Sequence, residues 1–271
     1  MEKTILITGA SRGFGKLWAK EFLKRGDKVI ATARNIDDLQ DLVLEYGNSI
    51  LPQQLDVTSR AQCFEVVNSA YAYFGKLDVV INNAGYGLFG AVEEANEQEI
   101  RNQCETNVFG TLWINQAVIP VMRKQGSGHI IQVSSVLGIT AIPLLGIYNS
   151  SKWTVEAITE SMAQETASFG IKTTLIEPIA YNTDFSGASG VNSKGIDAYD
   201  DLRSAVYQQR ESMPFGNPEA TSAVIVKIVD AQNPPSRIFF GNSALPWVKQ
   251  VYAERISQWE QWSELSNAAH G

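Results

Sequence analysis

The sequence predicts a doubly wound α/β fold, a parallel sheet of about seven strands with helices on both faces. Short β-rich apolar runs alternate with segments whose apolar residues recur every three to four positions. Residues 79–81 form a continuous apolar run, which is typical of a strand buried on both faces. No repeat, linker or low-complexity tract divides the 271 residues, so we expect a single domain over 1–271.

The first half of the chain alternates between strand and helix. A strand opens the chain, and a glycine-rich turn joins it to a helix that Gly26 closes. Asn35 is a candidate helix cap after the second strand. The elements expected here are strands over 3–8, 29–33, 50–55 and 79–81, and helices over 14–25, 35–47, after Thr58 and over about 97–124.

The second half continues the alternation with one departure. We expect strands over 130–133, 173–176 and 237–240, helices over 148–169 and 220–230, and a helical tail over about 245–271. The segment 180–215 is expected to be irregular and is rich in glycine and aromatic residues. A long insertion of this kind is commonly an active-site lid, so we predict a substrate lid here. The alternative is a solvated surface excursion.

Composition excludes several classes of function. With 22 basic and 29 acidic side chains the net charge is −7, which argues against nucleic-acid binding. Two distant cysteines, Cys63 and Cys104, indicate a reduced compartment, and two histidines are too few for most His-based metal sites. The chain shows no apolar run of membrane-spanning length and no signal peptide, so we expect a cytoplasmic protein without membrane contact.

The turn after the first strand carries a candidate phosphate-binding site. Gly9, Gly13 and Gly15 lie at the mouth of the first helix, with Ser11 and Arg12 between them. Glycine lets a phosphate approach the backbone, and a helix N-terminus offers free N–H groups. In an alternating α/β chain this position predicts a Rossmann-type dinucleotide site.

A hydrolase is the competing interpretation of the same turn. Residues 9–13 also match the Gly-x-Ser-x-Gly nucleophile elbow, with Ser11 as the nucleophile. That site needs a histidine downstream, and the chain offers only His129, in an apolar strand, and His270, at its tail. We therefore disfavour hydrolysis.

The end of the second strand predicts which dinucleotide binds. A carboxylate there would accept hydrogen bonds from the ribose 2′-hydroxyl of NAD(H), but the chain has Arg34. Arg34, with Arg12 as a second positive arm, fits the 2′-phosphate of NADP(H), which we favour over NAD(H). The alternative is that these arginines are surface charges and that Asp37 or Asp38 reaches the ribose.

Tyr148, Lys152 and Ser135 are candidate catalytic residues because of their spacing and their place in the predicted fold. Tyr148 and Lys152 lie four positions apart, one turn along a predicted helix. Ser135 follows the strand over 130–133, at the sheet edge where open α/β folds bind ligands. Reducing a ketone by hydride transfer builds alkoxide character on its oxygen, which needs a hydrogen-bond donor and a proton.

Together these motifs resemble the short-chain dehydrogenase/reductase family. The ordered set spans about 175 residues: Thr8-Gly9 to Gly15, Asp56-Val57, Asn82-Asn83-Ala84-Gly85, Asn107, Ser135, Tyr148/Lys152, and Glu177-Pro178 with Thr183. The end of the second strand and the helical tail are similar to the branch of 17β-hydroxysteroid dehydrogenase-like ketoreductases. Ile179 follows Pro178 where the family usually has glycine.

The resemblance implies a catalytic group of four residues. Tyr148 would donate the proton, and Ser135 would orient the substrate oxygen. Lys152 would bond the nicotinamide ribose and, with the positive nicotinamide, lower the phenol pKa by roughly three units. Asn107 would hold a water that links Lys152 to solvent.

The resemblance also assigns the remaining cofactor contacts. Asp56 and Val57 would contact the adenine ring, Asn83 would lie against the adenosine ribose, and Thr183 would bond the carboxamide. From the residues alone, Asp56 could instead be a helix cap near Thr58.

The expected function is hydride transfer between NADP(H) and a ketone or secondary alcohol. The candidate substrate-facing residues are apolar, with no surplus of basic residues to bind a carboxylate: Tyr86, Leu88, Phe89, Val136, Leu137, Leu144, Leu145 and Ile147. The alternative is a regulatory protein that binds NAD(P) without turnover. The resemblance implies a homodimer or homotetramer, and Trp247, Trp259 and Trp262 of the tail would cover the pocket or join a subunit contact.

Overall fold

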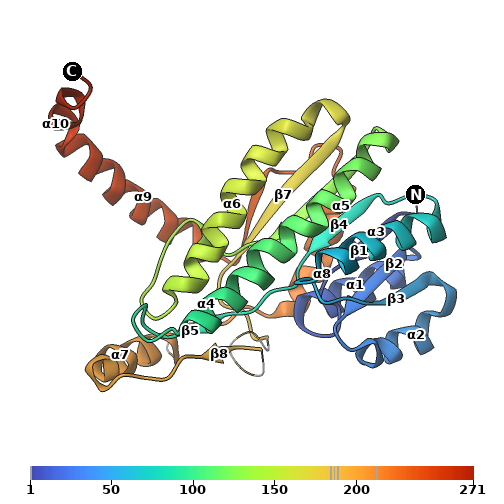
Figure 1. Ribbon diagram of the computed structural model, residues 1–271, viewed down its shortest axis with the longest axis horizontal. Coiled ribbons are helices and arrows are strands. Elements are labelled where there is room, and N and C mark those ends of the chain that lie inside the picture. The colour runs from blue at the N-terminus through green and yellow to red at the C-terminus, as the bar shows by residue number, and fades with distance from the viewer. Residues whose placement is uncertain (1, 184, 186, 188, 212) are drawn as a thin grey trace.

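A seven-stranded parallel sheet forms the centre of the computed structural model (Figure 1), which describes residues 2–183, 185, 187, 189–211 and 213–271. The strand order is β3-β2-β1-β4-β6-β7-β9. The strands are β1 (Thr4–Ile7), β2 (Lys28–Ala33), β3 (Ile50–Gln54), β4 (Val79–Asn82), β6 (Gly128–Val133), β7 (Ile171–Pro178) and β9 (Arg237–Phe240). The predicted fold is confirmed.

The strand order reverses direction between β1 and β4. The chain builds outward from β1 to β3, returns to place β4 on the other side of β1, and then builds outward to β9. Ile5 of β1 accordingly pairs with Val29 on one side and Val79 on the other. Loops that leave the two central strands diverge, which opens a crevice at the carboxyl edge of the sheet.

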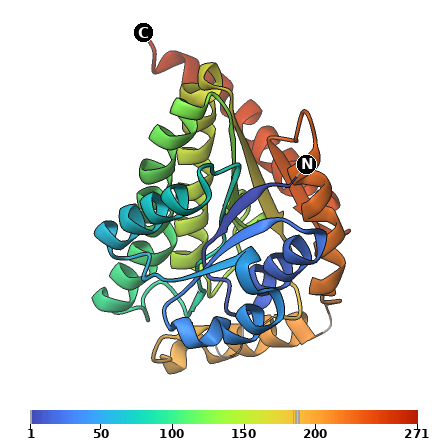
Figure 2. The ribbon, with the colours of Figure 1, turned by 90° about the vertical axis from the view of Figure 1, so that its right-hand side faces the viewer.

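Helices cover both faces of the sheet (Figure 2). On one face lie α1 (Gly13–Arg25), α2 (Gln40–Tyr46) and α8 (Thr221–Asp230), whose buried residues share a core with Ile5 and Ile7. On the other lie α3 (Arg60–Phe74), α5 (Gly110–Gln125) and α6 (Gly146–Thr166), packed around Leu6 and Val80. Alternate residues of β1 thus enter opposite cores, as a doubly covered strand requires.

The predicted helix over 97–124 is interrupted. It consists of α4 (Glu97–Cys104), a π-helical turn over Glu105–Phe109, and α5. A π turn inserts an extra residue into the helical ladder and often marks a functional site. Here the turn carries Asn107, which is 1% exposed. Periodicity alone did not reveal it because the apolar spacing continues through the turn.

The predicted lid over 180–215 is more regular than its sequence indicates. Positions 184, 186, 188 and 212 lie outside the described residues. The remainder includes β8 (Val191–Asn192), which pairs with β5 (Leu88–Phe89), a 3-10 turn over Asp197–Tyr199, and α7 (Asp200–Glu211). The expectation of an irregular segment is therefore wrong for α7. Two aspartates in its first turn complement the helix dipole and form a local start signal for this helix.

The tail is helical as predicted and extends away from the sheet (Figure 1). It comprises α9 (Ala244–Gln261) and α10 (Ser263–Ala268). Trp259 and Trp262 are exposed, whereas Trp247 packs in a small apolar cluster with Tyr148. Within the described residues, no helix combines the length and apolarity needed to cross a bilayer.

A buried hydrogen bond that joins α1 to α8 offers a test of the packing. Trp18 Nε1 donates to Thr221 Oγ1 at 2.8 Å, and both residues are at most 2% exposed. Thr221→Val leaves the indole N–H without a partner, so we expect the free energy of unfolding to fall by about 1–3 kcal/mol. Urea denaturation measures the loss. The control Thr154→Val removes an exposed bond to Ser150 and should cost less than about 0.5 kcal/mol. Equal losses would contradict the argument.

Candidate active site

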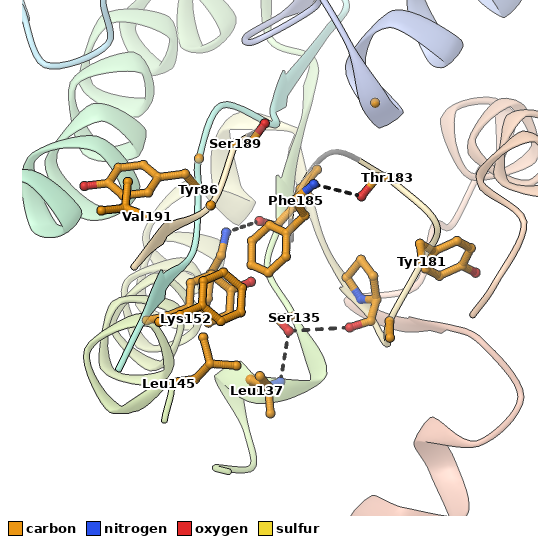
Figure 3. Close-up of a pocket in the computed structure, with 18 of the residues that line it drawn as sticks. Tyr86, Ser135, Leu137, Leu145, Lys152, Tyr181, Thr183, Phe185, Ser189 and Val191 are labelled. Carbon is orange, nitrogen blue, oxygen red and sulfur yellow. Dashed lines mark hydrogen bonds between the residues drawn. The ribbon is translucent and has the colours of Figure 1, made fainter. Parts of the chain in front are cut away.

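A cavity of about 1540 Å³ lies at the carboxyl edge of the sheet, where the strand order reverses. Its lining comes from the glycine turn after β1, the segments after β4, β6 and β7, and α7. Figure 3 shows part of it, with Ser135, Lys152 and Thr183 on separate segments. Predicted site residues that line it are Gly9, Ser11, Arg12, Gly13, Arg34, Asp56, Val57, Asn83, Ser135, Tyr148, Lys152 and Thr183.

Two predicted site residues, Gly15 and Asn107, lie behind this lining. Gly15 packs directly beneath the glycine turn. A Cβ placed there would come within 2.3 Å of the Gly9 carbonyl oxygen and 2.6 Å of Asn83 Nδ2. Gly9 itself has φ +68, a conformation that favours glycine. Gly15 therefore shapes the turn from behind.

Hydrogen bonds attach the glycine turn to the end of β4. Asn83 Nδ2 donates to the carbonyl oxygens of Thr8 and Gly9 at 3.0 and 2.9 Å. Thr8 Oγ1 in return accepts from the backbone N–H groups of Asn83 and Ala84, each at 3.0 Å. The Asn83 side chain thus forms its hydrogen bonds with the turn. Its predicted contact with the adenosine ribose stays a prediction.

The adenosine end of the cavity carries positive charge. Arg12 and Arg34 both line it, and neither forms an ion pair within the described residues. Asp38 also lines this region, so the alternative of a carboxylate at the ribose stays open. Asp56 Oδ1 accepts from the N–H and hydroxyl of Thr58, while Ser59 caps α3. Asp56 therefore stabilises a turn at the cavity rather than a helix end.

The proposed reacting groups are buried at the other end of the cavity. Ser135 Oγ accepts from the N–H of Leu137 at 3.1 Å and donates to the Pro178 carbonyl at 3.5 Å (Figure 3). Lys152 Nζ donates to the Val133 carbonyl at 2.8 Å and lies 5.8 Å from the centre of the Tyr148 ring.

Burial alone moves the two titrating groups toward their neutral forms. It raises the pKa of Tyr148, and a hydrogen bond from Ser135 opposes the rise only in part. Burial lowers the pKa of Lys152 to about 8, against the attraction of Glu156. The downward shift expected for the phenol is opposite to the direction found in the protein alone. The phenol keeps its proton at neutral pH, which suits an acid.

Asn107 supports the segment beside Lys152. Its Oδ1 accepts from the N–H of Tyr86 at 3.1 Å, and its Nδ2 donates to the Tyr86 carbonyl at 3.0 Å and to Ser151 Oγ at 3.1 Å. A Cβ on Gly85 would meet Asn107 Oδ1 at 3.0 Å and Lys152 Nζ at 3.7 Å. Asn107 thus fixes the backbone that faces Lys152, and its predicted water stays a prediction.

Gly241 leaves space for Ile179, the residue that stands where the family usually has glycine. The Ile179 N–H donates to the Phe240 carbonyl at 3.0 Å. Gly241 lies against the Ile179 side chain, where a Cβ would come within 2.3 Å of Ile179 Cδ1. Gly241 has φ +117, so glycine is favoured there for both reasons. The larger residue after Pro178 is accommodated, and Thr183 still lines the cavity.

The apolar wall largely matches the predicted one. Tyr86, Phe89, Val136, Leu137, Leu144 and Leu145 line the cavity. Leu88 and Ile147 do not, which corrects the prediction, since each follows or precedes a lining residue and side chains of adjacent residues diverge. Sequence reasoning also missed Arg203 and Arg210 of α7, because that segment was expected to be irregular. Arg203 pairs with Glu94, and Arg210 lies over the rings of Phe89 and Phe215.

The geometry does not support the hydrolase interpretation. His129 opens β6 at the amino edge of the sheet, away from Ser11, and bonds Thr174 Oγ1. Burial lowers its pKa to about 4. His270 is exposed in the tail. The described residues also hold no cluster of three or more His, Cys, Asp or Glu side chains suited to a metal ion.

The comparisons agree with this site. The family described as short chain dehydrogenase matches residues 3–193, so the chain belongs to the short-chain dehydrogenases and is an oxidoreductase with an NAD(P)-binding fold. It is 38% identical to a 3-ketodihydrosphingosine reductase of Bacteroides thetaiotaomicron, over 93% of this chain and 91% of the relative.

Two solved structures extend the likeness over the whole fold. A short-chain dehydrogenase from Streptomyces avermitilis superposes with a TM-score of 0.92 at 32% identity, and the match covers 99% of both chains. The structure of ElxO with NADP bound has a TM-score of 0.76 at 27% identity, covering 91% of this chain and 100% of the other. These matches support a nicotinamide cofactor.

The tight packing of Gly15 generates a prediction. Gly15→Ala should displace the Gly9 carbonyl and weaken NADPH binding by about tenfold or more, because small shifts of a positioning backbone have large effects. Fluorescence titration with NADPH measures the affinity. The control Gly75→Ala lies at φ +74 with no atom within 4 Å of its Cβ, so it should lower stability without changing the affinity. Unchanged binding by the Gly15 variant would refute the packing argument.

Proposed function

We propose that the protein is an NADP(H)-dependent reductase that transfers hydride between the nicotinamide and an apolar ketone or secondary alcohol. The observation that carries this proposal is the placement of Ser135, Tyr148 and Lys152 in the same cavity as the glycine turn. The alternative, a regulatory protein that binds NAD(P) without turnover, would have no need for a buried tyrosine and lysine.

The preference for NADP(H) is supported by charge. Arg12 and Arg34 offer two guanidinium groups at the adenosine end, where a 2′-phosphate would sit. A structural relative was solved with NADP bound. Another, at 26% identity, was solved with NADH, so the proposed preference rests on Arg12 and Arg34 rather than on the relatives.

The residues divide the proton chemistry among them. When bound, the nicotinamide supplies or accepts the hydride. Ser135 donates a hydrogen bond to the carbonyl oxygen, which holds the reacting carbon in place. Tyr148, protonated at neutral pH because it is buried, gives its proton to the oxygen as negative charge develops there. The Lys152 ammonium stabilises the phenolate that remains.

Apolar walls support an apolar substrate. Val136, Leu137 and Leu145 cluster with Tyr148, and the Phe185 ring lies 5.1 Å from the Tyr148 ring, centre to centre. The name of the Bacteroides relative specifies a keto compound, which supports a ketone here. Arg210 adds a positive charge to one part of the cavity.

We further propose a cytoplasmic homodimer or homotetramer, for which the exposed Trp259 and Trp262 of the tail would provide apolar contact surface.

Turnover with a ketone panel tests the function. Wild-type protein should consume NADPH with apolar aromatic or steroid-like ketones, whereas Tyr148→Phe should lose at least about 100-fold in kcat while NADPH affinity is kept, because the proton donor is gone. Absorbance of NADPH reports the rate. The control Tyr73→Phe, on an exposed ring, should behave as wild type. Cofactor binding without turnover on any ketone would favour the regulatory alternative, and full activity of Tyr148→Phe would refute the assignment of the acid.

Arg34 tests the cofactor preference. Arg34→Ala should raise the Kd for NADPH by about tenfold or more, because a hydrogen bond to a charged group is lost, and should leave the Kd for NADH within about twofold. The control Arg101→Ala removes an exposed arginine that pairs with Glu97. Equal weakening of both cofactors would mean that Arg34 does not read the 2′-phosphate.

A further inference from the structure

A charge cluster with two buried carboxylates lies along α6 beyond Lys152. It consists of Arg237 with Glu156, Glu160 and Glu177, and we call it the Arg237 cluster. We propose that Glu156 is a positioning residue of the reaction: its carboxylate, bonded to Arg237 and one helical turn from Lys152, keeps Lys152 an ammonium while Tyr148 donates its proton. This inference rests on the proposed reductase function.

The spacing along α6 places these groups on one face of the helix. Tyr148, Lys152, Glu156 and Glu160 follow one another at intervals of four residues, so each lies one turn beyond the last. Tyr148, Lys152 and Glu156 are buried, with 4%, 7% and 4% of their surfaces exposed. The Glu160 side chain is 60% exposed. The helix therefore carries a line of titratable groups from the cavity to solvent.

Arg237 holds the carboxylates of this line from a neighbouring strand. Its Nη1 lies 2.7 Å from Glu156 Oε2 and 2.8 Å from Glu177 Oε1, and its Nη2 contacts Glu160. Glu177, on β7, is 1% exposed. One guanidinium thus faces three carboxylates, so the cluster has negative charge in excess. Buried charge of this kind requires a further cation or a bound proton.

The two buried carboxylates, Glu156 and Glu177, differ in their protonation. Burial raises the pKa of Glu177 to about 7, and the charge of Glu156 adds to the rise, so Glu177 takes up a proton near neutral pH. Burial also raises the pKa of Glu156, but Ser134, Arg237 and Lys152 all oppose the rise. Glu156 Oε2 lies 2.7 Å from Arg237 Nη1, and Lys152 lies one helical turn away, so we assign Glu156 the negative charge.

Lys152 depends on that charge. Its Nζ donates to the Val133 carbonyl from β6 and lies over the Tyr148 ring, and Glu156 follows it by one turn of α6. Burial lowers the pKa of Lys152 to about 8, and Glu156 acts in the opposite direction. Gly138 gives Glu156 the space it occupies, since a Cβ there would lie 2.8 Å from Glu156 Cγ.

Removal of the Glu156 charge should lower the pH at which ketone reduction is lost. The reducing enzyme needs Tyr148 protonated and Lys152 charged. Loss of a proton from either group lowers the local positive charge, and the negative charge of Glu156 disfavours that loss. Without the Glu156 charge, the first proton leaves at lower pH, whichever of the two groups loses it. The alkaline limb of the pH profile of ketone reduction must then move to lower pH.

The experiment compares two glutamates that share one arginine. For Glu156→Gln we expect the alkaline limb of kcat for ketone reduction by NADPH to move down by about one pH unit or more, because a buried neighbouring charge is removed. The control Glu160→Gln removes an exposed partner of Arg237 and should move the limb by less than about 0.3 unit. Equal shifts in both variants, or no shift in Glu156→Gln, would overturn the proposal.

A second readout does not require turnover. In the cofactor-free protein with ¹⁵N-labelled lysine, the Nζ resonance assigned to Lys152 by its loss in Lys152→Met should titrate at lower pH in Glu156→Gln than in the wild type. An unchanged titration would overturn the proposal even if no ketone is found. If no ketone is reduced but the titration shifts, the proposed function fails while the Glu156–Lys152 linkage stands. If the glutamine variant does not fold, Glu156→Met removes the same charge without leaving a buried amide unpaired, and must give the same shift.

Discussion

The reversal of strand order between β1 and β4 is the constraint on which the rest of the molecule depends. It makes the loops at the two central strands diverge, which opens the crevice where open α/β sheets bind their ligands. Thr8 and Asn83 then hold the two loops together, since the side chain of each forms a hydrogen bond with the backbone of the other. The glycine turn keeps its shape because the neighbouring strand end supports it, and Gly15 leaves room for that support.

Burial of Tyr148 and Lys152 is the second constraint, because burial disfavours the charged forms of both side chains. Tyr148 and Lys152 are both buried beside the cavity, and burial pushes both toward neutrality. A neutral phenol suits an acid, but a neutral lysine would not stabilise the phenolate. The Arg237 cluster supplies a negative charge at the back of Lys152. The sheet makes this possible, since β7 and β9 bring Glu177 and Arg237 beside α6.

Two further parts of the chain line the cavity, α7 and the β5–β8 pair. α7 forms from a mostly polar segment and β5 from an apolar one, and with β8 they place Arg210, Phe89 and Val191 on the cavity. The cavity is therefore apolar near Tyr148 and charged near α7. Most of the apolar wall was predicted from the sequence, whereas Arg203 and Arg210 of α7 were not.

The sequence by itself determined the strand and helix alternation, the glycine turn, and the group of Ser135, Tyr148 and Lys152, because these depend on local periodicity and on fixed spacing within single elements. Only the tertiary structure decided the rest. The π turn that buries Asn107 and the accommodation of Ile179 by Gly241 depend on packing between distant segments. The pairing of Glu156 with Arg237, 81 positions later in the chain, is a contact that no local pattern encodes, since only the closing of the sheet brings the two residues together.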